Sequence, residues 1–287
     1  MRIFLRIAVW LIGLILLVYV VLLFSRPPRT GYQADLFQGV TYTRLAHSQP
    51  RPLMVHIVEI DLTAPDIGFF VTPGEAGNEL EVSARTTGAF LKEFDLQVAV
   101  NGGFFDPFHA RAPWDYYPRV GDPVNVRGLA ISNGQLYSTD YPQNPALCLS
   151  DGLTRIVQGA CPEGTLQGLS GNPLLVRDGV SAIRQRQGAL HPRTVVAVDE
   201  AGKRLWLVVI DGRQDYYSEG VTLAELADII VSLGADTALN LDGGGSTTLA
   251  IASGGRTRVL NAPIHTRIPM RQRPIANHLG IYAQPLE

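Results

Sequence analysis

The stretch Thr237–Thr248 (TALNLDGGGSTT) joins a short apolar run to an aspartate, three glycines and three hydroxyl side chains. Its first part, residues 237–241, predicts a short buried strand. Each glycine adds entropy to the unfolded chain, so an ordinary turn does not account for all three. We therefore expect the loop after Asp242 to form a nest of backbone N–H groups facing an anion, with Ser246 and Thr247 as further donors.

Two other apolar runs end in the same way. Residues 98–100 lead to Asn101-Gly102-Gly103, and residues 207–210 lead to Asp211-Gly212-Arg213. A glycine after a polar residue lets the backbone turn sharply and lets a ligand come close. Asp-Gly and Asn-Gly are also ordinary turn pairs, and for Asp211 alone that explanation is equally good.

Two arginines border predicted strand ends rather than a helical face. Arg193 precedes one strand and Arg213 follows another, and each carries a planar fork of donors that suits a phosphate. His191 stands two residues before Arg193, where a structural role and a catalytic role are equally good explanations. Asp106 precedes a proline, and an Asp-Pro turn explains it as well as a functional role does.

Between these motifs the chain alternates short apolar runs with turn residues. This pattern predicts an α+β fold, with a mixed or antiparallel sheet and a few packed helices in a single domain. Residues 53–62 predict a strand, and Asn133-Gly134 between two apolar runs predicts a tight hairpin. The clearest helix begins at the capping box of Thr222 and Glu225, and a shorter helix is expected over Ser83–Phe94 with Ser83 as its N-cap.

The composition is that of a globular protein, with 287 residues, 46% apolar residues and a net charge of −2. This charge provides no basic field that would hold nucleic acid, so we expect no nucleic-acid partner. The two cysteines, Cys148 and Cys161, have no zinc-binding spacing. We favour a disulfide between them over two free thiols.

The N-terminus differs from the rest because it runs without a charge from Ile7 to Phe24. That length suits a membrane-spanning helix, and the absence of a small-residue cleavage pattern favours an uncleaved signal anchor over a removed signal peptide. We expect an anchor over residues 1–25, a linker over 26–45 and a catalytic domain over 46–287. The protein would then lie in the cytoplasmic membrane as a single-pass protein, with its domain on the periplasmic or extracellular side.

Seven short segments occur in order along the chain. They are Asn101–Phe105, Gly171–Pro173, His191–Thr194, Asp211–Arg213, Thr222–Leu226, Asn240–Thr248 and Arg273–His278. Together they resemble the phosphodiester glycosidase family over residues 50–283, and Asn240–Thr248 is the most specific of them. The resemblance implies hydrolysis of a sugar 1-phosphodiester to a free sugar and a phosphomonoester, here in an envelope or extracellular glycan.

This resemblance suggests roles for the motif residues. A phosphomonoester is a good leaving group, so the site needs donors for the phosphate and a carboxylate facing the anomeric carbon. We expect Asp242, Asp211 and His191 to be catalytic, with no metal ligand and no cofactor, although a divalent cation could take part. The expected substrate- and phosphate-binding residues are Arg193, Arg213, Asn101, Gly102, Gly103, Asn172, Asn240, Gly243, Gly244, Gly245, Ser246 and Thr247.

Two other functions fit parts of the sequence. Asp106, Asp211 and Asp242 could hold a hard cation in a phosphodiesterase that breaks a P–O bond. Alternatively, aromatic residues such as Trp114, Tyr116 and Tyr117 could stack on sugars in a non-catalytic glycan-binding accessory of exopolysaccharide assembly. The partners expected from the sequence are a carbohydrate phosphodiester and the membrane that receives the N-terminal helix.

Overall fold

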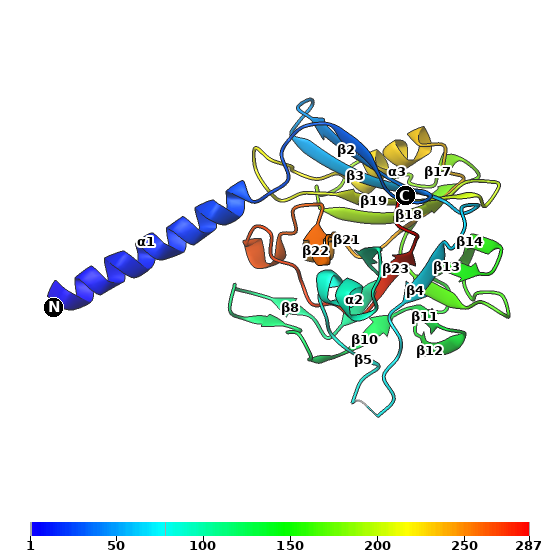
Figure 1. Ribbon diagram of the computed structural model, residues 1–287, viewed down its shortest axis with the longest axis horizontal. Coiled ribbons are helices and arrows are strands. Elements are labelled where there is room, and N and C mark those ends of the chain that lie inside the picture. Colours follow the sequence, from blue (N-terminus) through cyan, green and yellow to red (C-terminus); the bar gives the residue numbers. More distant parts are fainter. Residues whose placement is uncertain (1, 78, 287) are drawn as a thin grey trace.

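The computed structural model describes residues 2–77 and 79–286, but not the side chains of residues 2, 3, 5 and 8. The first residue of the expected anchor and the last residue of the expected catalytic domain lie outside this description. The described chain folds mostly into antiparallel sheets with three α-helices, as a single domain (Figure 1).

The largest sheet has eight strands and carries most of the strands expected from the sequence. One of its faces is covered by α3 (Leu223–Ser232), whose capping box between Thr222 and Glu225 is formed as predicted. Leu226 and Ile230 of this helix pack on Val195 and Val208 of the sheet. In spatial order the strands are β1 (Tyr32–Phe37), β2 (Val40–His47), β3 (Leu53–Asp61), β19 (Arg204–Ile210), β18 (Arg193–Val198), β20 (Thr237–Asn240), β16 (Leu174–Arg177) and β17 (Val180–Ser181).

Two five-stranded sheets and two small ones complete the fold. The first contains β22 (Arg256–Val259), β21 (Leu249–Ser253), β6 (Val98–Asn101), β23 (His278–Tyr282) and β4 (Gly68–Val71). The second contains β12 (Gln135–Thr139), β11 (Leu129–Ser132), β15 (Gln167–Ser170), β13 (Pro145–Ser150) and β14 (Leu153–Gln158). The small sheets contain β5 (Val82–Ser83), β10 (Pro123–Arg127) and β7 (Phe104–Asp106), and the hairpin β8 (His109–Ala110) and β9 (Tyr116–Tyr117).

One apolar core joins the three larger sheets. It includes Val196 and Leu239 of the eight-stranded sheet, Val100 and Leu279 of the first five-stranded sheet, and Leu147 of the second, all fully buried. Burial of these side chains is the main driving force for folding, and it holds the ends of β6, β18 and β20 in fixed positions. The candidate site is built on those strand ends.

The turn chemistry follows the sequence closely. Asn133 and Gly134 join β11 to β12 with φ angles of 49° and 76°, which is the left-handed pair that a two-residue hairpin requires. The short helix α2 (Thr87–Glu93) differs from the prediction, because Thr86 and not Ser83 is its N-cap and accepts from the Ala89 N–H. Ser83 lies in β5 instead, paired with Pro123, so its backbone is committed to a strand.

A helix, α1 (Arg2–Phe24), forms over the apolar N-terminal run and projects away from the rest of the molecule (Figure 1). Within the described part of the chain, no helix reaches the length and apolarity needed to cross a membrane. The predicted transmembrane anchor is therefore not supported.

The segment expected to be a linker, residues 26–45, belongs in large part to the eight-stranded sheet. Strand β1 and most of β2 fall inside it, and β2 pairs with β3 along its whole length. Val40 and Tyr42 of β2 are buried in the main core. The alternation of apolar and polar residues in β2 is the strand signal that the linker interpretation overlooked.

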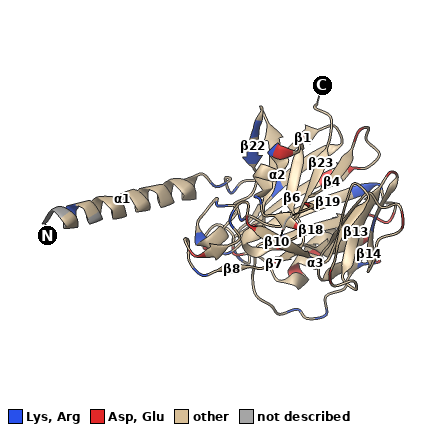
Figure 2. Cartoon of the chain, turned by 90° about the horizontal axis from the view of Figure 1, so that it is seen from below, with Lys and Arg blue, Asp and Glu red and all other residues tan. Residues whose placement is uncertain are grey.

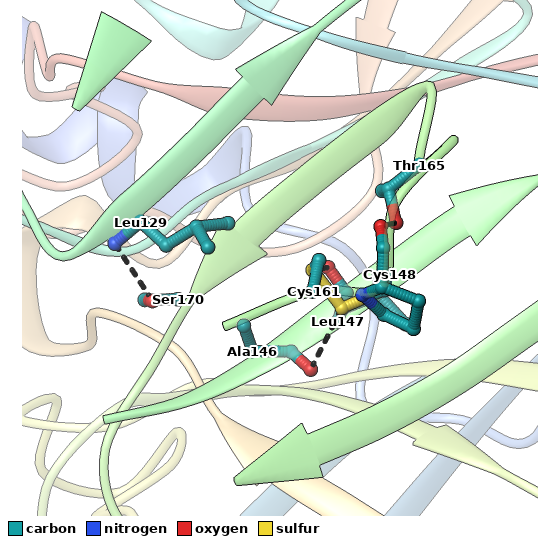
Figure 3. Close-up of a disulfide and its surroundings, with 8 residues drawn as sticks. Leu129, Ala146, Leu147, Cys148, Cys161, Thr165 and Ser170 are labelled. Carbon is teal, nitrogen blue, oxygen red and sulfur yellow. Dashed lines mark hydrogen bonds between the residues drawn. A yellow bond between two sulfur atoms is a disulfide. The ribbon is translucent and has the colours of Figure 1, made fainter. Parts of the chain in front are cut away.

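The two cysteines form the expected disulfide between Cys148 and Cys161 (Figure 3). Cys148 lies in β13 and is buried beside Leu129 and Ile131 of the same sheet. The bond links β13 to the loop that follows β14, so it closes a short loop within one sheet. The sheet that holds it contributes no residue to the candidate site described below.

Reduction of this disulfide should lower the melting temperature by about 6–12 °C, because closing a loop of this size contributes about 3 kcal/mol. Differential scanning calorimetry with and without reductant measures the change. The double variant Cys148→Ala/Cys161→Ala is the control, because reductant should leave its melting temperature unchanged. An equal melting temperature for the wild-type protein in both conditions would contradict the prediction.

Candidate active site

The register of the eight-stranded sheet brings three sequence motifs to the same end of its interior strands. Strand β18 runs antiparallel between β19 and β20, with Arg193 opposite Ile210 and Val195 opposite Asn240. The beginning of β18 therefore lies beside the ends of both neighbours. Asp211 directly follows β19 and Asp242 lies two residues after β20, so both are at the same end of these strands as His191.

The Asp242 carboxylate interacts with two arginines of this region, Arg273 and Arg213. One of its oxygens accepts from the Gly243 N–H at 2.8 Å and the other accepts from the Ser246 hydroxyl. Burial raises the pKa of Asp242, while Arg273, Ser246, the Gly243 N–H and Arg213 oppose the rise. A carboxylate with a raised pKa beside two arginines is suited to proton transfer near a bound anion.

The three glycines have a different role from the expected anion nest. The Gly243 N–H donates to Asp242 and the Gly244 N–H donates to the Pro192 carbonyl at 2.9 Å, so both amides are used within the protein. A side chain at Gly244, where φ is 62°, would meet the Arg213 guanidinium at 2.9 Å, and one at Gly245 would meet the Arg273 guanidinium at 2.4 Å. Glycine is needed here because two guanidinium groups lie against the loop backbone.

Arg273 is a site residue that sequence reasoning missed, although it opens the last of the seven motif segments. Its Nη1 donates to Ser246 Oγ at 3.0 Å and its Nε donates to His265 Nδ1 at 3.2 Å. Its guanidinium also lies over the Phe108 ring, 4.3 Å from the ring centre. Burial lowers the pKa of Arg273 to about 10, with Asp242 opposing the change and Arg213 adding to it, so the group stays charged at neutral pH.

His191 and Arg213 form a pair on the other side of Asp242. Arg213 Nη2 donates to His191 Nδ1 at 3.2 Å, and Arg213 has a left-handed backbone with φ of 58°. Burial, with Arg213 and Arg193 nearby, lowers the pKa of His191, so its ring is neutral at neutral pH. Because Nδ1 accepts from Arg213, the ring proton lies on Nε2.

His191, Arg213 and Arg273 line a cavity of about 730 Å³, whereas Asp242 is not among its lining residues. Four arginines line it, and Asp215 is the acidic residue among its lining residues. Within residues 2–77 and 79–286, no salt bridge neutralises any of the four. The cavity is thus electropositive and suited to a phosphate group. The four arginines are Arg26, Arg213, Arg267 and Arg273, and His191, Thr266, Tyr19 and Leu23 lie in the same wall.

Asp211 lies beneath the site and not in it. Its side chain is fully buried, with Oδ2 3.0 Å from His56 Nε2 and with Oδ1 accepting from Asn261 and from the Ala262 N–H. His56 Nδ1 is in turn 2.8 Å from the Tyr42 hydroxyl. Both carboxylate oxygens are therefore occupied, and the network fixes the chain at 261–262, just before the segment that lines the cavity.

The remaining predicted residues hold loops together. Asn101 Nδ2 donates to the Asp242 carbonyl at 2.7 Å, and its Oδ1 accepts from Thr194 and from the Thr248 N–H. Arg193 donates to the carbonyls of Val221 and Ala189 and does not line the cavity.

The other predicted binding residues also lie outside the cavity lining. Asn240 Nδ2 donates to the Asn172 carbonyl, which ties β20 to the turn before β16. Ser246 and Thr247 are buried, and Ser246 contacts the site through Asp242 and Arg273. Gly102 and Gly103 pack against Asn277 and Ser170, where no side chain would fit.

The three aspartates of the alternative metal site are separated in the fold. Asp106 pairs with Arg127 at 3.3 Å on β7, Asp211 is buried with His56, and Asp242 faces the arginines. Across the described residues, no group of three or more His, Cys, Asp or Glu side chains has the arrangement to hold a metal ion. Whether a cation takes part in the reaction stays an open prediction of the sequence.

Known structures share this fold. A hypothetical protein from Synechocystis matches with a TM-score of 0.66 and 18% identity, over 91% of this chain and 64% of its own. The zebrafish N-acetylglucosamine-1-phosphodiester α-N-acetylglucosaminidase catalytic domain, auto-inhibited by its pro-peptide, matches with a TM-score of 0.60 and 22% identity, over 89% and 88%. A putative exported protein from Burkholderia pseudomallei matches with a TM-score of 0.59 and 16% identity, over 80% and 74%.

At these identities the structural matches establish the fold alone. The chain spans about 64% of the length of the Synechocystis protein. None of the curated proteins matches the sequence significantly. The sequence pattern of the phosphodiester glycosidases, however, matches residues 94–282, which include His191, Arg213, Asp242 and Arg273. The chain therefore belongs to the phosphodiester glycosidase family.

Proposed function

We propose that this protein hydrolyses a sugar 1-phosphodiester by breaking the bond between the anomeric carbon and the phosphate oxygen. The products are a free sugar and a phosphomonoester. The observation that carries the proposal is the Asp242 carboxylate, set beside Arg213 and Arg273, two arginines that line an electropositive cavity. A single carboxylate with phosphate-binding groups is what this reaction needs, because the leaving group is already acidic.

Asp242 acts as the general base in this proposal. It takes a proton from the water that attacks the anomeric carbon, and the electrons of the broken C–O bond pass to the phosphate oxygen. Arg213 and Arg273 stabilise the negative charge that grows on that oxygen. His191 holds a proton on Nε2 and orients the phosphate or a sugar hydroxyl, while Asp211 positions the loop through His56 and Asn261.

Isotope labelling distinguishes this reaction from P–O cleavage. The full-length chain would be incubated in ¹⁸O-water with an α-N-acetylglucosamine 1-phosphodiester. This compound is chosen because the zebrafish relative is named for its action on such a diester. The phosphate product is the readout, since the anomeric oxygen of a free sugar exchanges with water. Unlabelled phosphate supports the glycosidase reaction, whereas labelled phosphate would establish the alternative phosphodiesterase.

Replacing Ser246 by alanine should move the acid limb of the kcat/KM profile to higher pH. The Ser246 hydroxyl lowers the pKa of Asp242, which burial has raised, so its removal raises that pKa further. A general base is active when deprotonated, and activity is lost as the pH falls through its pKa. A pH–rate profile of both proteins measures the shift, and an acid limb that moves to lower pH would contradict the role of Asp242 as base.

The compartment is also part of the proposal. We place the domain outside the cytoplasm, acting on an envelope or extracellular glycan. The disulfide supports this location, because such bonds persist in oxidising compartments, and one structural relative is described as a putative exported protein. Labelling of intact cells with a thiol-reactive polymer would find Cys148 and Cys161 unreactive until a reductant is added; free thiols would contradict it.

A further inference from the structure

A second cavity lies beside the arginine-lined one, between α1 and the β8–β9 hairpin. Its volume is about 720 Å³, within the usual range for small-molecule sites. We call it the apolar groove. One wall is formed by Ile15, Val18, Tyr19 and Leu22 of α1, and the other by residues 110–114 and 266–268.

The α1 wall is a continuous apolar stripe. Ile15, Val18, Tyr19 and Leu22 have the i, i+3, i+4, i+7 spacing that places side chains on one face of a helix. Along this face the exposed fraction falls from 66% at Ile15 and 51% at Val18 to the half-buried Leu22 near the domain, and Leu17 on the opposite face is 59% exposed. Figure 2 shows α1 almost wholly without charged residues, and none of the four residues of the stripe is charged.

The hairpin wall adds an aromatic side chain. Trp114, near the tip of the hairpin, is 77% exposed and lines the groove together with Ala112 and Pro113. Tyr116 of the same hairpin packs edge-on against His265, with 4.9 Å between the ring centres. This contact holds the hairpin next to Arg273, which donates to His265. An exposed indole facing an apolar helix marks a binding surface for apolar groups.

The groove is continuous with the arginine-lined cavity. Tyr19, Ala110, Thr266 and Arg267 line both spaces. Thr266 and Arg267 have left-handed φ angles of 52° and 62°, a conformation that costs free energy for residues other than glycine and is concentrated at functional sites. Arg267 thus lies where a charged cavity passes into an apolar one.

We propose that the apolar groove binds the hydrocarbon chain of the substrate's alcohol, so that the substrate is a sugar 1-phosphodiester of a long-chain alcohol. This inference rests on the proposed function. The phosphate lies among Arg213, Arg267 and Arg273, the sugar faces Asp242, and the chain extends along α1. Water breaks the bond between the sugar and the phosphate oxygen, and the alkyl phosphate remains as the phosphomonoester product.

A hydrocarbon chain fits the groove better than a second sugar does. A sugar acceptor carries hydroxyl groups on all sides and loses hydrogen bonds with water when it enters an apolar space. An alkyl chain instead gains free energy from burial, and each methylene that leaves water strengthens binding about fourfold. The charged cavity beside the groove matches the single phosphate that such a lipid carries.

Binding of two products tests the inference without relying on turnover. Titration calorimetry would compare geranyl phosphate with methyl phosphate on the full-length chain, both below their critical micelle concentrations. We expect the geranyl ester to bind at least about a hundredfold more tightly, since several methylenes enter the groove. Equal affinities for the two phosphates would overturn the inference.

Two matched variants locate the effect. Leu22→Ser should reduce the ratio of geranyl to methyl affinity at least tenfold, because Leu22 lines the groove. Leu17→Ser makes the same change on the opposite face of α1 and should leave the ratio as in the wild type. A ratio that falls equally in both variants would show that the chain binds elsewhere on the helix and would overturn the assignment to the groove.

Cleavage rates of the methyl and geranyl sugar 1-phosphodiesters distinguish the long-chain substrate from the glycosidase reaction itself. Cleavage of the methyl diester with no preference for the geranyl diester, together with equal affinities of the two phosphates, removes the long-chain substrate and leaves the glycosidase. Tight binding of geranyl phosphate with no cleavage of either diester removes the glycosidase reaction and leaves a lipid-phosphate site. Preferential cleavage of the geranyl diester supports both.

Discussion

Replacing Asp242 by asparagine should lower kcat by about a thousandfold or more while the protein stays folded. The substitution keeps the size of the side chain and its contacts with the Gly243 N–H and Ser246, but it removes the group that accepts the proton. General base catalysis contributes about 10²–10⁴-fold to a rate, and, against the lowering by burial, Asp242 is the carboxylate that raises the pKa of both Arg213 and Arg273. Initial rates with a sugar 1-phosphodiester measure the loss, and circular dichroism checks the fold.

Asp106→Asn is the matched control for this experiment. Asp106 is also a polar residue at a turn, but it pairs with Arg127 away from the cavity, so its replacement should leave kcat within about twofold. The assignment fails if Asp242→Asn keeps near-normal activity while Asp106→Asn loses it. Loss in both variants would show that the stability of the β7 region, and not the cavity, limits the rate.

Replacing Arg273 by glutamine should lower kcat/KM by about 10²–10³-fold. Its guanidinium faces the cavity, held by Ser246 and His265, and loss of one fixed donor to a developing anion costs about this much in known enzymes. We expect most of the loss in kcat, because charge on the leaving phosphate is greater in the transition state than in the bound substrate. Steady-state kinetics over a range of substrate concentrations separates the two parameters.

Two further variants control for charge and geometry. Arg256→Gln makes the same change on the exposed strand β22 and should leave both kinetic parameters unchanged. Arg273→Lys keeps the charge but loses the planar fork, so it should recover only part of the activity. Full recovery with lysine would mean that Arg273 acts as a point charge, and an unchanged kcat in Arg273→Gln would remove it from the catalytic site.

The strand ends of the site could be predicted from sequence because their signals are local. Apolar runs before Asn101, Asp211 and Asp242 do form β6, β19 and β20. The register of β18 with β19 and β20 brings Asp211 and Asp242 to one region, and Asn101 of another sheet joins them through its hydrogen bond to the Asp242 carbonyl. The capping box at Thr222 and the Asn133-Gly134 hairpin depend on residues that are near in sequence, and both form as expected.

The roles at those ends were less predictable, because they depend on contacts across the fold. Asp211 and Asp242 look alike in sequence, yet Asp211 meets His56 on β3 and is buried, whereas Asp242 meets two arginines. Nothing near Asp211 in sequence indicates His56. Arg273 reaches the site from a distant segment, and its own neighbours in sequence do not show which loop it contacts.

The attachment of the chain just after α1 has a practical consequence for the choice of expression boundaries. Two residues after the end of this helix are held on the segment that follows β19: Arg26 lies over the Tyr217 ring, and the Tyr217 hydroxyl donates to the Pro27 carbonyl. A truncated protein that starts after residue 30 would lack Tyr19, Leu23 and Arg26, and with them one wall of the entrance. Assays of such a fragment would report on the chemistry of Asp242 but would misjudge which substrates the intact enzyme prefers.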